Sequence, residues 1–150
     1  MAIPPDTVSG AQRRAERAAA GLFGRDRASQ ALGMRITGVR PGWARVAMMV
    51  RADMLNGHGL CHGGIVFALA DSAFAFACNS HNESTVAAAA TIDFLAAARE
   101  DDELTAEASE LWRTRRNGIY EITVSNQRGE RIALFRGRSY RIDGQVVSGE

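Results

Sequence analysis

Asp71 stands out chemically because it is the one charged side chain between Gly63 and Ser80, a strongly apolar segment. Burying an unpaired carboxylate is unfavourable by roughly several kcal/mol. Two interpretations follow. In the first, Asp71 has a structural role and is held by a hydrogen bond to a neighbour such as Ser72 or to a backbone group. In the second, it is a catalytic base or nucleophile in a site that excludes water.

Two glycines, Gly63 and Gly64, open the same segment, with Gly63 eight residues before Asp71. If a helix begins here, its first N–H groups lack intrahelical partners and lie at the positive end of the helix dipole. Glycine also lets a ligand approach the backbone closely. N–H donors for a developing oxyanion, together with a carboxylate that acts on a carbonyl carbon or on water, form the two halves of an acyl-transfer site.

The spacing keeps these halves apart in one chain. Eight helical residues correspond to ~12 Å of rise and ~80° of rotation, so Asp71 cannot reach a carbonyl held by the Gly63 of its own chain. Two antiparallel helices from two chains would place each Asp71 near the partner's Gly63. The spacing therefore predicts a homodimer with two equivalent sites.

Polar residues around the start of this helix offer further candidates. Asn56 could orient a water or the reacting carbonyl, or it could simply build an Asx turn. His62 could contact the reacting group or support the loop. A zinc pair of His58 and His62 is disfavoured because Gly57 and Gly59 argue against the helix that such a pair would need, and no metal site is predicted. Cys61 as a nucleophile is also disfavoured, because adjacency to His62 in the sequence does not imply the contact that a nucleophile makes with its base.

The pattern of the chain predicts the elements that position these residues. Ser9-x-x-Gln12 resembles a capping box that opens a helix to about Ala20. A segment that is apolar nearly all round predicts a buried helix. Alternation and turn signals, including Asn117-Gly118 as a two-residue hairpin turn, predict strands. The expected elements are helices at 9–20, 26–32 and 62–79 and strands at 34–38, 44–50, 84–98, 104–114, 119–126 and 131–142.

This order predicts an α+β fold, an antiparallel sheet curled around one central helix, because that helix must bury every face. With 150 residues and no linker or internal repeat, the chain is expected to be one domain. Residues 1–33 would form an N-terminal helical segment packed on a main unit of residues 34–150.

Bulk composition excludes several functions. The formal net charge of +1 gives no reason to expect a nucleic acid or an anionic membrane as partner. The two cysteines support no disulfide framework. The N-terminus lacks a secretory pattern, and no apolar run approaches the ~20 residues of a membrane span. The expectation is a soluble, cytoplasmic protein.

Residues 55–79, LNGHGLCHGGIVFALADSAFAFACN, resemble the Asn…His-Gly-Gly…Asp motif of the PaaI-type thioesterases of the hotdog fold, linked to phenylacetic acid degradation. The similarity continues at residues 91–95 and 133–141. It implies a hotdog fold, a dimer-built site, assembly as a tetramer and hydrolysis of arylacetyl-CoA thioesters. It also implies Asp71 as base or nucleophile, Gly63 as oxyanion donor, and Asn56 and His62 as positioning groups. No cofactor is implied besides the coenzyme A of the substrate.

Coenzyme A carries phosphates, so arginines are expected at the outer end of such a site. Arg136 and Arg138 share a strand face by alternation, and Arg113 lies in a cluster at a hairpin end, although surface solubility explains each equally well. Gly64 and the apolar side chains of Phe67 and Phe74 are candidates for contact with the acyl group. The two phenylalanines are equally good core residues.

Two other functions remain open. The same fold could bind acyl-CoA without turnover, which the full motif disfavours. It could also carry hydratase or dehydratase chemistry, but no histidine is spaced suitably near Asp71 within its helix. The sequence therefore predicts an acyl-CoA thioesterase, with phenylacetyl-CoA or a ring-hydroxylated form as substrate.

Overall fold

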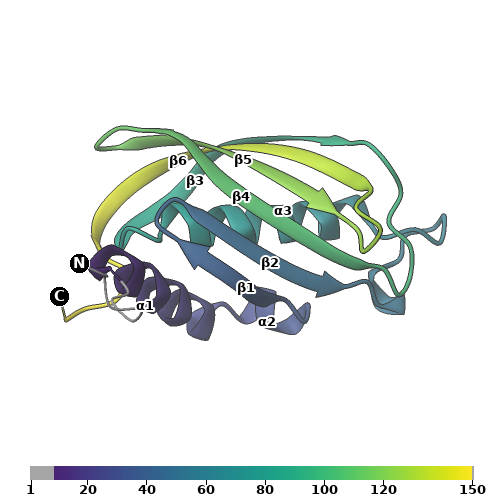
Figure 1. The fold of residues 1–150 in the computed structure, drawn as a ribbon. Helices are drawn as coiled ribbons and strands as arrows, with labels where there is room; N and C mark the ends of the chain where they lie inside the picture. Colours follow the sequence, from purple (N-terminus) through teal and green to yellow (C-terminus); the bar gives the residue numbers. More distant parts are fainter. Residues whose placement is uncertain (1–8, 150) are drawn as a thin grey trace, which may run out of the picture.

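The computed structural model describes residues 9–149, and its elements follow the order helix, helix, two strands, helix, four strands (Figure 1). α1 spans Gly10–Arg25 and α2 spans Arg27–Ala31. Ser9 caps α1 by accepting a hydrogen bond from the Gln12 N–H at 3.1 Å. The Gln12 side chain does not complete the box, because it donates instead to the Val39 carbonyl at 2.8 Å.

α1 ends five residues later than the sequence predicts, at Arg25 rather than at about Ala20. Its last turns carry Leu22 and Phe23, which pack against the core, and the Phe23 ring lies 6.0 Å from that of Phe76. This tertiary contact extends the helix through Gly21 and Gly24, which disfavour helix on propensity alone.

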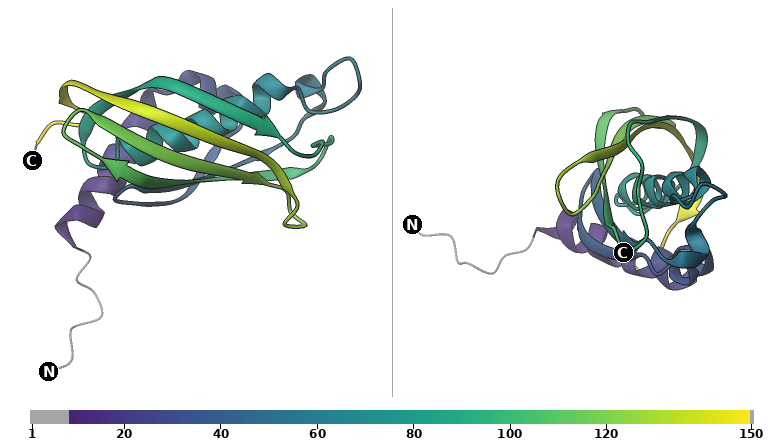
Figure 2. Two further views of the ribbon diagram at one scale, coloured as in Figure 1. Left: turned by 90° about the horizontal axis from the view of Figure 1, so that it is seen from above. Right: turned by 90° about the vertical axis from the view of Figure 1, so that its right-hand side faces the viewer.

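The six strands form one antiparallel sheet in the order β1-β2-β4-β5-β6-β3. The strands are β1 (Arg35–Arg40), β2 (Trp43–Met49), β3 (Glu83–Phe94), β4 (Glu103–Arg113), β5 (Asn117–Ser125) and β6 (Arg131–Gln145), with a short 3-10 turn, η1, at Ala52–Met54. Figure 2 shows the sheet curling around the third helix, while α1 lies along β1. The predicted α+β architecture is confirmed.

α3, Gly63–Cys78, is the enclosed helix. Its side chains Leu69, Phe74 and Phe76 are almost completely buried, and the Phe74 ring packs against Tyr120 of β5 and Phe135 of β6. The sheet approaches so closely at Gly137 that a Cβ atom there would lie 2.8 Å from the Phe74 ring. At the far end, Asn79 exchanges two 3.0 Å hydrogen bonds with the Thr85 backbone, which ties the helix to the start of β3.

Two sequence predictions about strands and turns were wrong. Asn117 and Gly118 do not form the β4–β5 turn. They begin β5 and pair with β6, and the turn is made by the three residues before them, closed by a 2.7 Å bond from the Thr114 N–H to the Asn117 carbonyl. Close packing explains this glycine, because a Cβ at Gly118 would lie 2.8 Å from Ser139 Oγ. β3 also ends at Phe94 rather than at Ala98.

The sheet has two edges, β1 and β3. β3 is the longer edge, and most of its residues are exposed. Within the described residues, no helix combines the length and apolar character required to cross a membrane. No observation tests the division at residue 33, which stays a prediction.

Candidate active site

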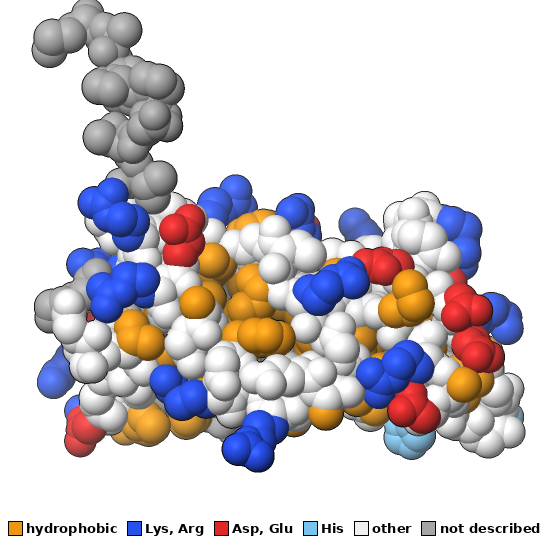
Figure 3. All heavy atoms as spheres, turned by 90° about the horizontal axis from the view of Figure 1, so that it is seen from below, with side chains coloured by type: hydrophobic (Ala, Val, Ile, Leu, Met, Phe, Trp, Pro, Cys, Tyr) orange, Lys and Arg blue, Asp and Glu red, His pale blue; other side chains and the backbone are white. Residues whose placement is uncertain are grey.

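Two pockets lie against α3, one at its start and one at its middle. The first, of about 320 Å³, is lined by Asn56, Gly63 and apolar residues that include Phe94. We call it the Gly63 pocket. The second, of about 190 Å³, is lined by Asp71 and by residues of the α1–α2 corner, and we call it the Asp71 pocket. Figure 3 views the face that carries α1 and α2, where apolar side chains gather around a hollow.

The first turn of α3 leaves one backbone donor free. The Gly64 N–H donates to His62 Nδ1 at 2.9 Å, and the Ile65 N–H donates to the His62 carbonyl at 2.9 Å. Within residues 9–149 the Gly63 N–H has no such partner. It lies at the positive end of the helix dipole and beside a pocket, so it can donate to an oxyanion. Gly64 cannot do the same without losing its cap.

His62 acts as the N-cap of α3. Because Nδ1 accepts the bond from Gly64, the proton of the neutral ring is on Nε2. The side chain is exposed, so its Nε2–H points to space outside the chain's own core. The structure therefore gives His62 a loop-supporting role and leaves one N–H available to a ligand.

Asn56 closes the loop that leads into α3. Its Oδ1 accepts from the backbone N–H groups of His58 at 2.9 Å and Leu60 at 3.2 Å, as an Asx turn does. The side-chain carbonyl is thus occupied, whereas the Nδ2 group has no partner among the described residues. Asn56 can donate to a substrate carbonyl or to a water, but it cannot accept a proton from that water.

The Asp71 carboxylate is half-buried and accepts no hydrogen bond and no ion pair from any residue in the range 9–149. The hydroxyl of Ser72 lies 2.8 Å from Ser29 Oγ, so the structural interpretation that pairs it with Asp71 does not hold in this chain. Burial, and then the negative charge of Asp26, raise the pKa of the Asp71 carboxyl. An unpartnered carboxylate of raised proton affinity beside a pocket has the properties of a general base.

One chain does not bring Asp71 and Gly63 together. They line different pockets, and eight residues of helix separate them by ~12 Å along α3. Phe67, four residues from each, is half-buried and packs its ring 5.1 Å from Phe135. Phe74 is a core residue, 1% exposed. Neither phenylalanine lines either pocket, and their contact with an acyl group stays a prediction.

The candidate arginines lie away from the Gly63 pocket. Arg136 and Arg138 are exposed neighbours on one face of β6, as predicted, and Arg138 donates to Asn117 Oδ1 at 3.2 Å. Arg113 lies 3.8 Å from Glu83, at the opposite end of β3 from Phe94. A role for them at coenzyme A phosphates would need a partner chain or an extended ligand, and it also stays a prediction.

The geometry gives no support to Cys61 as a nucleophile or to a metal site within residues 9–149. Burial, and then the charge of Asp102, raise the pKa of the Cys61 thiol to about 11, so it is not a ready nucleophile at neutral pH. No three His, Cys, Asp or Glu side chains of residues 9–149 come together as a metal centre requires.

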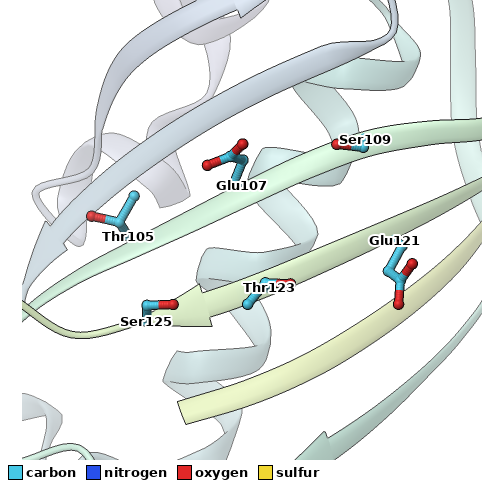
Figure 4. Close-up of a pocket in the computed structure, with 6 residues that line it drawn as sticks. All are labelled: Thr105, Glu107, Ser109, Glu121, Thr123 and Ser125. Carbon is cyan, nitrogen blue, oxygen red and sulfur yellow. The ribbon is translucent and has the colours of Figure 1, made fainter. Parts of the chain in front are cut away.

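A larger polar depression, about 380 Å³, lies on the outer face of β4 and β5 (Figure 4). Its residues are Thr105, Glu107, Ser109, Glu121, Thr123 and Ser125. They alternate with the buried residues that face α3, so the depression is on the other side of the sheet from both α3 pockets. It contains none of the candidate residues.

Sequence reasoning missed Asp26 and Ser29, which line the Asp71 pocket from the N-terminal segment. Asp26 caps α2 by accepting from the Ser29 N–H at 2.9 Å. The Asp-x-x-Ser spacing before a helical run was a visible cap signal. Nothing in the sequence indicated which pocket this cap would border.

A curled six-stranded antiparallel sheet wrapped around one long buried helix is the architecture of the hotdog fold. The model of the thioesterase superfamily matches residues 58–133, and the chain belongs to this superfamily. Within it, the chain is a thioesterase of PaaI type. Acyl-coenzyme A thioesterase PaaI of Escherichia coli K12 is 46% identical over 126 residues, 84% of this chain and 90% of that protein.

Two solved structures support the same fold. The E. coli PaaI protein from the phenylacetic acid degradation operon superposes with a TM-score of 0.89 at 44% identity, over 91% of this chain and 99% of that chain. A hypothetical thioesterase from Streptococcus pneumoniae TIGR4, solved with coenzyme A, has a TM-score of 0.75 at 25% identity, over 84% of this chain and 96% of that chain. The sequence-based family and fold predictions are confirmed.

Proposed function

We propose that this protein hydrolyses acyl-CoA thioesters, with phenylacetyl-CoA or a ring-hydroxylated form as substrate, to the free acid and coenzyme A. The observation that carries the proposal is a half-buried Asp71 carboxylate and a Gly63 N–H on the same helix, neither of which has a hydrogen-bond partner among the described residues. The names of the E. coli relative and its operon support the substrate class. No cofactor is needed beyond the coenzyme A of the substrate.

The two halves of the site would meet across a homodimer. β3 is a sheet edge of 12 residues, and its stretch from Val86 to Ala90 is exposed and uncharged. Such an edge is a template for pairing with another chain. Antiparallel pairing of two β3 strands would extend the sheet and set the two α3 helices side by side in opposite directions. Each Asp71 would then face the partner's Gly63. Assembly into a tetramer and a cytoplasmic location remain predictions.

In this site the partner subunit's Gly63 N–H would donate to the thioester oxygen. The amide of the partner's Asn56 and the Nε2–H of the partner's His62, at the same end of that helix, would help to hold the carbonyl or the water. Asp71 would take a proton from that water as its oxygen attacks the carbonyl carbon. The negative charge that develops on the carbonyl oxygen would be stabilised by the backbone N–H of the partner's Gly63. Collapse of the intermediate breaks the C–S bond, and the coenzyme A thiolate leaves.

Thiol release from phenylacetyl-CoA and from a panel of aliphatic acyl-CoAs tests the proposal. We expect hydrolysis by the wild type and a loss of ~10²-fold or more in Asp71→Ala, the effect of losing a general base. Asp143→Ala is the matched control, because that carboxylate is exposed at the end of β6. Binding of acyl-CoA without thiol release by the wild type would favour the binding protein, and full activity in folded Asp71→Ala would remove this residue from the mechanism.

A further inference from the structure

A hydrogen-bonded bridge joins the α1–α2 corner to α3 at the residue next to Asp71. Asp26 Oδ1 accepts from the Ser29 N–H at 2.9 Å, and Asp26 Oδ2 accepts from Ser29 Oγ at 2.6 Å. Ser29 Oγ in turn lies 2.8 Å from Ser72 Oγ. Ser29 is 3% exposed, so the bridge is internal.

The chemistry of the carboxylate fixes the direction of this bridge. An ionised carboxylate only accepts, so the Ser29 hydroxyl proton points to Asp26 and the Ser72 hydroxyl is the donor to Ser29. All three side chains therefore act together to hold the negative charge of Asp26 in place. Asp26, Ser29, Ser72 and Asp71 line the same pocket of about 190 Å³.

Few charged groups affect the pKa of Asp71. The groups in the described part of the chain that interact with it electrostatically are Asp26, from the α1–α2 corner, and the Cys78 thiol, from its own helix. The other residues of the pocket wall are apolar or carry hydroxyls, among them Ala28, Leu32 and Met34. In such surroundings a fixed negative charge favours the protonated form of a nearby carboxyl, which strengthens the carboxylate as a base.

We propose that Asp26 and Ser29 are positioning residues of the thioesterase site, which fix a second negative charge beside Asp71 and thereby set the pH range in which Asp71 works. The inference rests on the proposed function of Asp71, but it concerns residues of the N-terminal segment that do not touch the reacting atoms. It gives α2 a role in catalysis in addition to covering α3.

Two substitutions separate the charge from the bridge. Asp26→Asn removes the charge but keeps an oxygen that accepts from the Ser29 N–H. Ser29→Ala keeps the charge but removes the link to Ser72. Gln30→Ala is the matched control, because Gln30 lies on the same short helix and is exposed. Thermal melting checks that each variant is folded.

The primary measurement is a carboxyl NMR titration of aspartate-labelled protein, with the Asp71 signal assigned from Asp71→Asn. We expect the Asp71 midpoint to move to lower pH in Asp26→Asn, to move less in Ser29→Ala, and to stay in place in Gln30→Ala. The acid limb of kcat/KM for acyl-CoA should move in the same direction. Ser29→Ala should also lower kcat by about tenfold with little change in KM, the rate equivalent of one hydrogen bond.

An Asp71 midpoint that is unchanged in Asp26→Asn would overturn the proposal, whatever the activity. Suppose that the wild type hydrolyses acyl-CoA, that Asp71→Ala does not, and that the acid limb of the kcat/KM profile is unchanged in Asp26→Asn. The proposed thioesterase function is then supported, and the positioning role of Asp26 is contradicted. If the wild type hydrolyses nothing, the proposed function fails, and the NMR midpoint still decides whether Asp26 acts on Asp71.

Discussion

At the scale of single residues, the site combines groups whose usual partners are missing or already used. Among residues 9–149, Asp71 has no hydrogen-bond donor, the Gly63 N–H has no acceptor, and only the amide group of the Asn56 side chain is without a partner. Each is unfavourable for stability in an isolated chain, because half-buried polar groups lose hydration without compensation. Such groups are expected where a ligand or a partner completes them.

Asp71→Asn should therefore stabilise the fold while it abolishes activity. The folded pKa of Asp71 is raised above its unfolded value, so the favourable contribution of the carboxyl is present at low pH and is lost as pH rises through the folded pKa. Near neutral pH we expect asparagine to add roughly 1 kcal/mol, which corresponds to about 2–4 °C in Tm. Thermal melts of both proteins across pH test this.

The gain should shrink at pH values below the ordinary aspartate range, where the wild-type carboxyl is protonated in both states. Asp143→Asn, at an exposed carboxylate, serves as the control and should change Tm little at any pH. A lower Tm in Asp71→Asn at neutral pH would mean that the carboxylate has a stabilising partner in the assembled protein.

At the scale of elements, the start of α3 is organised by one side chain. His62 caps the helix through Nδ1 and closes the loop through its backbone, since its N–H donates to the Met54 carbonyl at 2.8 Å. His62 therefore belongs both to the helix cap and to the candidate site. Its side chain occupies the Gly64 N–H, so the Gly63 N–H is the remaining donor of this pair of glycines for a ligand.

Variants at His62 can separate its two roles. His62→Ala should lose about 1 kcal/mol of stability with the cap, whereas His62→Asn should recover the Tm because asparagine caps well. We expect both variants to hydrolyse acyl-CoA about tenfold more slowly, because neither supplies the Nε2–H. Wild-type rates in His62→Asn would show that the residue is a cap and nothing more. Melting curves and steady-state kinetics on the same samples provide the comparison.

At the scale of the whole molecule, Gly63 lies beside the β3 edge of the sheet, whereas Asp71 lies beside the α1–α2 corner. β3 carries exposed small side chains along that edge, with Phe94 next to Gly63, where a Cβ would lie 3.1 Å from the ring. A protein that used its site alone would have no need to keep Asp71 and Gly63 in separate pockets. The arrangement is consistent with a site made by two copies.

Complementation between inactive variants tests the shared site. Asp71→Asn lacks the base, and Gly63→Val places a branched side chain beside the amide and against Phe94. Each homodimer should be inactive, but a mixed dimer has one site with the intact Gly63 of one chain and the intact Asp71 of the other. Random pairing in co-expressed protein should restore about a quarter of wild-type activity.

Separately expressed variants that are mixed without exchange of subunits provide the negative control. Absence of recovery in purified mixed dimers would contradict a two-chain site, as would full activity of a wild type that sediments as a monomer.

The sequence by itself determined the central helix and the α+β class, because continuous apolar character and alternation are local signals. It also predicted the candidate site: Asp71 from its lone charge, Gly63 from a glycine pair, and Asn56 and His62 from the family motif. The same local signals misplaced the Asn117-Gly118 turn and ended α1 too early. There the outcome depends on long-range packing, of Gly118 against Ser139 and of Phe23 against Phe76.

Only the tertiary structure decided which groups are free. The sequence cannot indicate that Gly64 is capped while Gly63 is not, that Ser72 turns to Ser29 rather than to Asp71, or that Asp26 borders the same pocket. Hydrogen bonds and Coulomb interactions act through space, and they join residues 43 positions apart as readily as neighbours. The sequence therefore shows which residue types are present, whereas the fold decides their protonation and which of their hydrogen-bond donors remain available.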